Sequence, residues 1–178
     1  DLAHPNMQLY FSPLSYTRAP TGKRPLMTPD PFPGFLLGYN QCRPHSEGTI
    51  EIAAADPFAA PKIQPNYFDD PRDMAETIEC GRLLERLANA PSMAKVIDSF
   101  VLPEQPLASD EAWEAYVRAG AWTVFHPSCT CRMGGNVATS VVDPRLRVHG
   151  VEGLRIADAS VFPYVTSGNI NAPSIMVG

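Results

Sequence analysis

The stretch "DDPRDMAETIECGRLLERLANAP" (Asp69–Pro91) carries the clearest helix pattern in the chain. Asp70 can cap the N-terminus, and Pro71 suits the first helical position, where no backbone N–H is needed. Four apolar side chains mark one face of the helix, namely Met74, Ile78, Leu84 and Leu87. Pro91 ends the pattern. We therefore expect one long amphipathic helix with a single buried face.

β-prone segments precede this helix. "MQLYFSPLSY" (Met7–Tyr16) is aromatic-rich and predicts a strand. "FLLGYNQC" (35–42) and "GTIEIAA" (48–54) are joined by a short polar segment, so we expect them to be neighbouring antiparallel strands. In the second of them Ile50 and Ile52 share one face, which predicts a sheet with one wet face.

Residues 17–34 separate the first strand from the second and contain five prolines and two glycines. Such a composition predicts a surface loop, which could act as a lid.

The segments after the long helix predict two shorter helices, 92–100 and 109–121, opened by Ser92 and Ser109. Beyond Trp122 the pattern changes to short strands, turns and glycines. Strands followed by helices, without regular β-α-β alternation, predict an α+β fold in which an antiparallel sheet is flanked by helices.

Composition narrows the function classes. The chain has 178 residues, of which 44% are hydrophobic and 19% charged, as in an ordinary globular domain. A formal charge of -5 leaves no basic face for nucleic acid. No apolar run approaches the roughly 20 residues that span a bilayer. The opening Asp1-Leu2-Ala3 lacks the zones of a signal peptide, so we expect a cytoplasmic location and a piece of a longer protein.

The four cysteines are irregularly spaced and predict free thiols. His126, Cys129 and Cys131 form an H-x2-C-x-C pattern without the second ligand pair that structural zinc prefers, so we expect no metal. A disulfide between Cys129 and Cys131 is also unfavourable. In an extended chain the Cα atoms of residues two positions apart lie about 6.6 Å from each other, at the limit of the roughly 4.4–6.8 Å that a disulfide tolerates. Packing is the role we expect for both thiols.

Three polar side chains stand at places where sites collect. His126 follows a β-prone run at 123–125 and precedes a proline, but this segment alone favours a core histidine bonded to the backbone over a site residue. Asp158 ends the apolar part of "LRIADAS" (154–160). Its carboxylate either lies where a ligand approaches the backbone or makes an ordinary Asx turn. In "SGNINAP" (167–173), a helix cap explains Asn171 but not Asn169, and Pro173 suits a first helical position.

Three stretches, in this order, resemble the C-terminal signature of the glucose-methanol-choline (GMC) oxidoreductases, most strongly the choline-dehydrogenase-like branch. They are "FHPSCTCRMGG" (125–135), "VVDPRLRVHGVEGLRIADAS" (141–160) and "SGNINAPSIMVG" (167–178). Earlier segments, "MQLYFSP" and "GTIEIAAADPFAAPKIQPNYFDDPRDM", resemble the family's substrate-binding portion. The resemblance thus extends over nearly the whole chain.

The resemblance implies FAD-dependent oxidation of an alcohol to an aldehyde or ketone. His126 matches the family's catalytic histidine, which takes the proton of the alcohol. Asn169 matches the second member of the catalytic pair, here an amide that can bond the substrate oxygen. The resemblance also places several residues along the flavin, namely Phe125, Asp158, Ala159, Asn171, Ala172 and Pro173.

The chain departs from the family in one respect. No G-x-G-x-x-G turn for the cofactor's pyrophosphate occurs in it. We therefore expect a substrate-binding domain at 1–120, C-terminal pieces of the FAD-binding domain at 121–178, and a missing N-terminal part as partner beside the small-molecule alcohol. A homo-oligomer, a hydroxynitrile lyase on the same scaffold and a non-catalytic binding fragment stay open, as do the particular alcohol and the electron acceptor.

Overall fold

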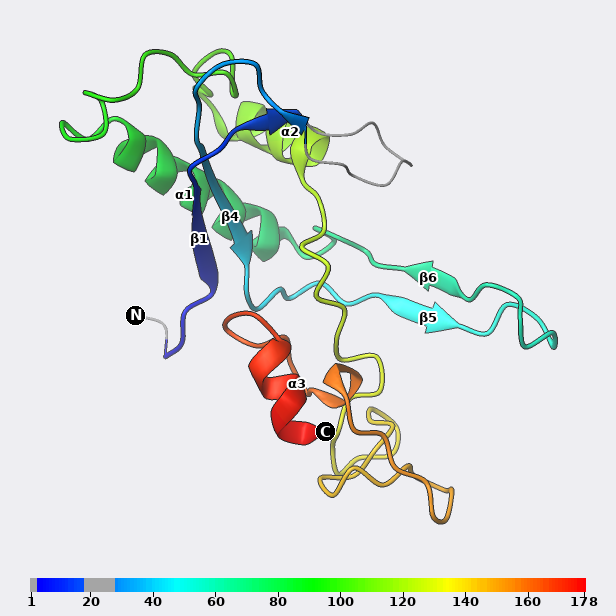
Figure 1. Ribbon diagram of the computed structural model, residues 1–178. Helices are drawn as coiled ribbons and strands as arrows, with labels where there is room; N and C mark the ends of the chain where they lie inside the picture. The colour runs from blue at the N-terminus through cyan, green and yellow to red at the C-terminus, as the bar shows by residue number, and fades with distance from the viewer. Residues whose placement is uncertain (1–2, 18–27) are drawn as a thin grey trace.

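A computed structural model describes residues 3–17 and 28–178 of the chain (Figure 1). Six short strands and two long helices are followed by a C-terminal part that is mostly loops, in the order β1 (Met7–Ser12), β2 (Tyr16–Thr17), β3 (Thr28–Pro29), β4 (Leu36–Gln41), β5 (Thr49–Glu51), β6 (Lys62–Gln64), α1 (Pro71–Ala88), α2 (Asp110–Gly120), the short 3-10 helix η1 (Ala159–Val161) and α3 (Asn171–Val177). The mixture of helices and small antiparallel sheets confirms the α+β prediction.

Helix α1 begins and ends close to where the sequence predicts. The Asp70 carboxylate accepts a hydrogen bond from the backbone N–H of Arg72, and Pro71 is the first helical residue. The helix ends at Ala88, and the backbone N–H of Asn89 bonds back to the last turn. Capping at both ends satisfies backbone groups that a helix leaves unpaired.

The first hydrophobic core lies between α1 and α2. Its buried members are Met74, Ile78, Trp113 and Val117, and Phe68, Leu107 and Tyr116 pack around them. Leu87 is wrongly predicted for the buried face, because its side chain is 43% exposed. The predicted second helix is confirmed as α2, where the Ser109 hydroxyl accepts from the N–H of Ala112.

The strands form three separate two-stranded antiparallel sheets. β1 pairs with β4, which packs against α1, and β5 pairs with β6 (Figure 1). The predicted pairing of residues 35–42 with 48–54 is therefore wrong. The connecting segment leads β5 away from β4, so β5 finds its partner locally. On the projecting hairpin Ile50 and Ile52 are both exposed.

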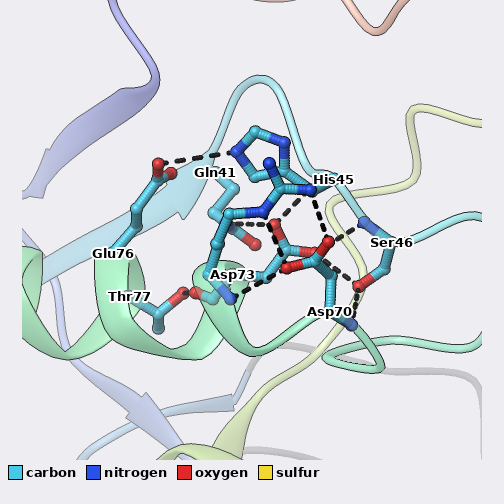
Figure 2. A network of polar contacts seen from close by, with 8 residues as sticks. Gln41, His45, Ser46, Asp70, Asp73, Glu76 and Thr77 are labelled. Atoms are coloured by element: carbon cyan, nitrogen blue, oxygen red, sulfur yellow. Dashed lines mark hydrogen bonds and ion pairs between the residues drawn. The ribbon is translucent and has the colours of Figure 1, made fainter.

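The segment that separates β4 from β5, here called the 43–48 loop (Arg43–Gly48), is fastened to the first turn of α1 by Asp73 (Figure 2). The Asp73 side chain is buried and accepts the backbone N–H groups of His45 and Ser46, both at 2.8 Å. It also accepts from the Ser46 hydroxyl and, at 3.1 Å, from the amide of Gln41. The sequence patterns do not predict this network, because its partners are far from Asp73 along the chain.

Residues 17–34 were expected to form a loop, and 18–27 lie outside the described residues. Their described neighbours include a short antiparallel pair, β2 with β3. The helix predicted at 92–100 is absent, and 91–96 form turns instead. The physical reason is lack of burial, since Val96 is 69% exposed and a helix this short depends on packing.

The predicted strands near the C-terminus are also absent. Phe125 has a φ of 59°, which interrupts an extended run at 123–125. At 154–158 the only ladder contact in the described chain is an isolated bridge between Arg147 and Arg155. These segments pack instead around the C-terminal core, whose buried members are Val142, Val161 and Phe162.

Gly81 sits where α1 approaches α2 and β4 most closely. A Cβ there would lie 2.4 Å from Trp113 Cζ3 and 2.8 Å from the Tyr39 hydroxyl oxygen. We expect Gly81→Ala to destabilise the protein by about 1–2 kcal/mol, because overpacking outweighs alanine's better helix propensity. Thermal unfolding followed by circular dichroism measures this. The control is Gly135→Ala, whose Cβ meets nothing within 4 Å, and an increased midpoint for Gly81→Ala would contradict the expectation.

All four cysteines are free thiols, as predicted, and Cys42 and Cys80 are buried. Burial raises the pKa of Cys42, and it raises that of Cys80 to about 11, which suits packing rather than reactivity. In the described part of the chain, no helix is long and apolar enough to cross a membrane.

Candidate active site

His126 lies on the segment that leads from α2 to the C-terminal core. Its side chain is half-buried, and it directly follows Phe125, whose positive φ turns the chain. The ring of Phe125 is 62% exposed and meets Trp122 edge-on, with 5.9 Å between the ring centroids. The turn thus carries an exposed aromatic ring and a half-buried imidazole on consecutive residues.

The residues after His126 are fastened to η1 by three backbone hydrogen bonds. The N–H groups of Cys129, Cys131 and Met133 donate to the carbonyls of Ala159 (3.2 Å), Ser160 (2.8 Å) and Val161 (2.9 Å). Alternate backbone amides of residues 129–133 therefore face the carbonyls of residues 159–161. Two of the sequence motifs are placed side by side in this way.

Asp158 caps η1. Its carboxylate accepts from the backbone N–H of Ser160 at 2.8 Å, and this hydrogen bonding holds the pKa of Asp158 below its ordinary value. This local geometry is that of an Asx turn, which is one of the two roles that the sequence allows for Asp158. The side chain is exposed and Ala159 is half-buried, so the turn has solvent access.

The third motif contributes α3. The N-cap residue is Ile170, and its side chain makes no capping bond. Asn171 is the first residue inside the helix, so its predicted capping role is wrong. The helix starts at Asn171 and Pro173 is its third residue rather than its first. The third position tolerates the missing N–H of Pro173, because the first four N–H groups of a helix have no partner within it. Asn169 is exposed just before this turn.

A shared core brings the three motifs together. Cys129 and Met133 come from the first motif, Ala159 from the second, and Ile170 and Val177 from the third, and all five pack against the C-terminal core. Figure 1 shows α3 beside η1 in the same part of the molecule. The segments that carry His126, Asp158 and Asn169 therefore form one unit, with several predicted site residues on its surface.

The residues present fit a flavin. The exposed ring of Phe125 offers an apolar face, and Asn171 and Ala172 are exposed at the uncapped start of α3. Uncapped amides favour electron-rich ligand atoms. In contrast, an open hollow of about 570 Å³ on the C-terminal part is lined by Asp143 and residues 147–155 and includes none of the predicted site residues.

Among the described residues, no three His, Cys, Asp or Glu side chains lie close enough to hold a metal ion. Sequence reasoning missed Arg132, which belongs to the His126 stretch but ion-pairs with Glu47 of the 43–48 loop. Only a pattern that linked positions 85 residues apart could have found this pair.

The sequence model of the family described as GMC oxidoreductase matches residues 44–178. The chain is 35% identical to human mitochondrial choline dehydrogenase over 178 residues, covering 98% of this chain and 28% of that protein. It is 40% identical to an alcohol dehydrogenase (acceptor) of Pseudomonas putida over 144 residues, covering 81% of this chain and 26% of that protein.

Solved structures agree. Formate oxidase from Aspergillus oryzae RIB40 superposes with a TM-score of 0.84 at 30% identity, over 99% of this chain and 30% of that one. Pyridoxine 4-oxidase from Mesorbium loti superposes with a TM-score of 0.75 at 26% identity, over 80% of this chain and 28% of that one. The chain spans less than a third of the length of these relatives. By its sequence and its fold, it belongs to the GMC oxidoreductase family.

Proposed function

We propose that this chain is the C-terminal part of an FAD-dependent oxidoreductase that oxidises the CH–OH group of a small alcohol to an aldehyde or ketone. The observation that carries the proposal is the packing of three sequence motifs on one core. His126 and Asn169 lie just before packed residues of the first and third motifs in the sequence. Relatives named choline dehydrogenase and alcohol dehydrogenase (acceptor) support the substrate class.

In the proposed reaction His126 takes the hydroxyl proton of the alcohol. An alcohol gives up hydride readily only as that proton leaves, and an imidazole is the side chain that most often acts as the general base in such a step. Asn169 donates its amide hydrogen to the substrate oxygen and holds it in place, but it is not a base. FAD, when bound, would supply the acceptor for the hydride.

The same proposal assigns the cofactor contacts. Phe125 would lie near the ring system, Asp158 and Ala159 would lie along the cofactor, and the start of α3 would approach the ring, through the residues Asn171, Ala172 and Pro173. We propose residues 1–120 as the substrate-binding portion and 121–178 as C-terminal pieces of the FAD-binding domain. A dinucleotide-binding part with a Gly-rich turn would complete the site.

The test is anaerobic reduction of the flavin. The intact enzyme, produced from the complete reading frame that encodes this chain, is mixed without oxygen with choline, 1-butanol or benzyl alcohol. We expect the visible absorption of the oxidised flavin to bleach with at least one of these probes, because hydride transfer reduces the ring. An enzyme that holds flavin but cleaves a hydroxynitrile without bleaching would instead support the lyase alternative. A protein that binds no FAD would contradict the proposal.

A further inference from the structure

The 43–48 loop touches both segments that carry the proposed catalytic pair. Glu47 Oε1 lies 2.9 Å from Arg132 Nη2, six positions after His126 in the first motif. Arg43 places its guanidinium carbon 5.7 Å from the ring centroid of Tyr164, five positions before Asn169. One loop therefore makes a charged contact with each segment.

The loop is itself held firmly on its other side. Asp73 of α1 binds the backbone N–H groups of His45 and Ser46, and the Ser46 hydroxyl also accepts from the backbone N–H of Asp70 at 3.0 Å (Figure 2). The carbonyl of Glu47 accepts from the Asn66 side chain at 3.0 Å. The backbone of the loop is thus fixed to α1 and to the segment after β6 before its side chains reach the C-terminal part.

Arg132 is equally well anchored on the C-terminal side. Its carbonyl accepts the N–H of Val141 at 2.9 Å, and the N–H of its neighbour Cys131 donates to Ser160 at 2.8 Å. The Glu47–Arg132 pair therefore joins two segments whose backbones are each held by hydrogen bonds. Its charged groups are partly exposed, with 69% of Glu47 and 37% of Arg132 accessible, so the pair contributes little to stability.

We propose that the 43–48 loop is a positioning device that sets the His126 and Asn169 segments at the correct distance from the substrate-binding part, with Glu47 and Arg132 as positioning residues. The inference rests on the proposed alcohol oxidation. Proton and hydride transfer depend steeply on geometry, and a displacement of about 1 Å can cost roughly a hundredfold in rate. A contact with little effect on stability can therefore have a large effect on rate.

The test is a charge swap in the intact FAD-loaded enzyme. Glu47→Arg and Arg132→Glu are made singly and together, and stopped-flow absorbance measures the flavin reduction rate at saturating alcohol, using the probe that bleaches the parent enzyme. We expect each single variant to slow reduction by about tenfold while the half-saturating alcohol concentration changes by less than about twofold. The double variant should recover to within about threefold of the parent, because the pair is restored in the opposite sense.

The matched control is the ion pair of Arg82 and Asp110, which joins α1 to α2 and is also exposed. Arg82→Glu and Asp110→Arg should leave the reduction rate unchanged, because this pair does not touch the C-terminal part. If Glu47→Arg does not yield folded protein, Glu47→Gln replaces it, with a decrease of about threefold or more expected.

The outcomes separate this inference from the proposed function. If the parent enzyme bleaches with an alcohol but the Glu47 and Arg132 variants reduce flavin at the parent rate, the positioning role is wrong and the alcohol oxidation stands. If the double variant is as slow as the product of the two single effects, the residues act independently and the positioning role is again wrong. If the parent enzyme holds FAD and does not bleach, the proposed function itself fails.

Discussion

Flavin reduction by alcohol should slow by at least about a hundredfold when His126 is replaced by alanine in the intact enzyme. Of the two proposed catalytic residues, His126 is the one whose side chain can act as a base near neutral pH, and general-base catalysis typically contributes about 10²–10⁴-fold. Asn169 cannot replace it because an amide does not take up a proton in this range. The measurement is the anaerobic rate of flavin bleaching at saturating alcohol.

The pH profile separates a base from a residue that only shapes the site. The parent rate should increase with pH, because only an unprotonated base can accept the alcohol's proton, and the alanine variant should lose this increase. His4→Ala is the matched control, because His4 is exposed near the start of the described chain and should leave both rate and profile unchanged. A His126→Ala enzyme with a near-normal rate would refute the assignment.

The second large effect concerns stability. Asp73→Asn should lower the free energy of unfolding by about 2–3 kcal/mol at pH 7. The Asp73 carboxylate accepts donors on both oxygens, with the His45 N–H on Oδ1 and the Ser46 N–H on Oδ2. Asparagine has nearly the same shape, but its NH2 group would face donors that it cannot bind. The part-buried donors that face this NH2 group would then lose their acceptor, and this loss is the costly part.

The lowered pKa of Asp73 sets how its contribution to stability depends on pH. Burial alone would raise the pKa of Asp73, but the hydrogen bonds from the 43–48 loop and from Gln41 outweigh it and hold the pKa below its ordinary value. A carboxyl whose pKa is lower in the folded than in the unfolded protein stabilises the fold above the unfolded value of about 3.9. This contribution is lost as the pH falls through the lower, folded value.

We therefore expect the stability difference between the parent and Asp73→Asn to be largest near neutral pH and to shrink below about pH 4. Thermal unfolding followed by circular dichroism at a series of pH values measures it. Asp98→Asn, at an exposed position after α1, is the control and should change the midpoint little at any pH. A constant difference from neutral to acidic pH would show that the lost hydrogen bonds do not depend on the charge.

Local patterns predict the helices of this protein well where a cap and a packed face coincide. Asp70 and Ser109 both cap the helices that they were expected to open. Where a cap residue stands before a segment that no core receives, as at Ser92, the same reasoning fails. A short segment with a good cap can favour a helix, but it forms a stable helix only when one of its faces is buried.

Strand pairing is the part of the fold that local patterns could not supply. Residues 35–42 and 48–54 are correctly predicted to contain strands, yet each pairs elsewhere, with β1 and with β6. Register and partner depend on where the connecting segment goes, and Asp73 of a later helix holds that segment. Information about the partner is therefore not present within either strand.

The sequence by itself determined the family and the α+β class, and it supplied the side chains that we propose for the chemistry, because such motifs are residue types at fixed positions. His126, Asn169 and the residues expected near the flavin follow from motifs that are contiguous in the chain. Only the tertiary structure decided how those motifs meet. Hydrogen bonds between distant backbones and a shared core join residues 129–133 to 159–161, and one ion pair reaches from Glu47 to Arg132. Such contacts form because the whole chain minimises buried, unpaired polar groups and exposed apolar surface together, and no short window of sequence contains that balance.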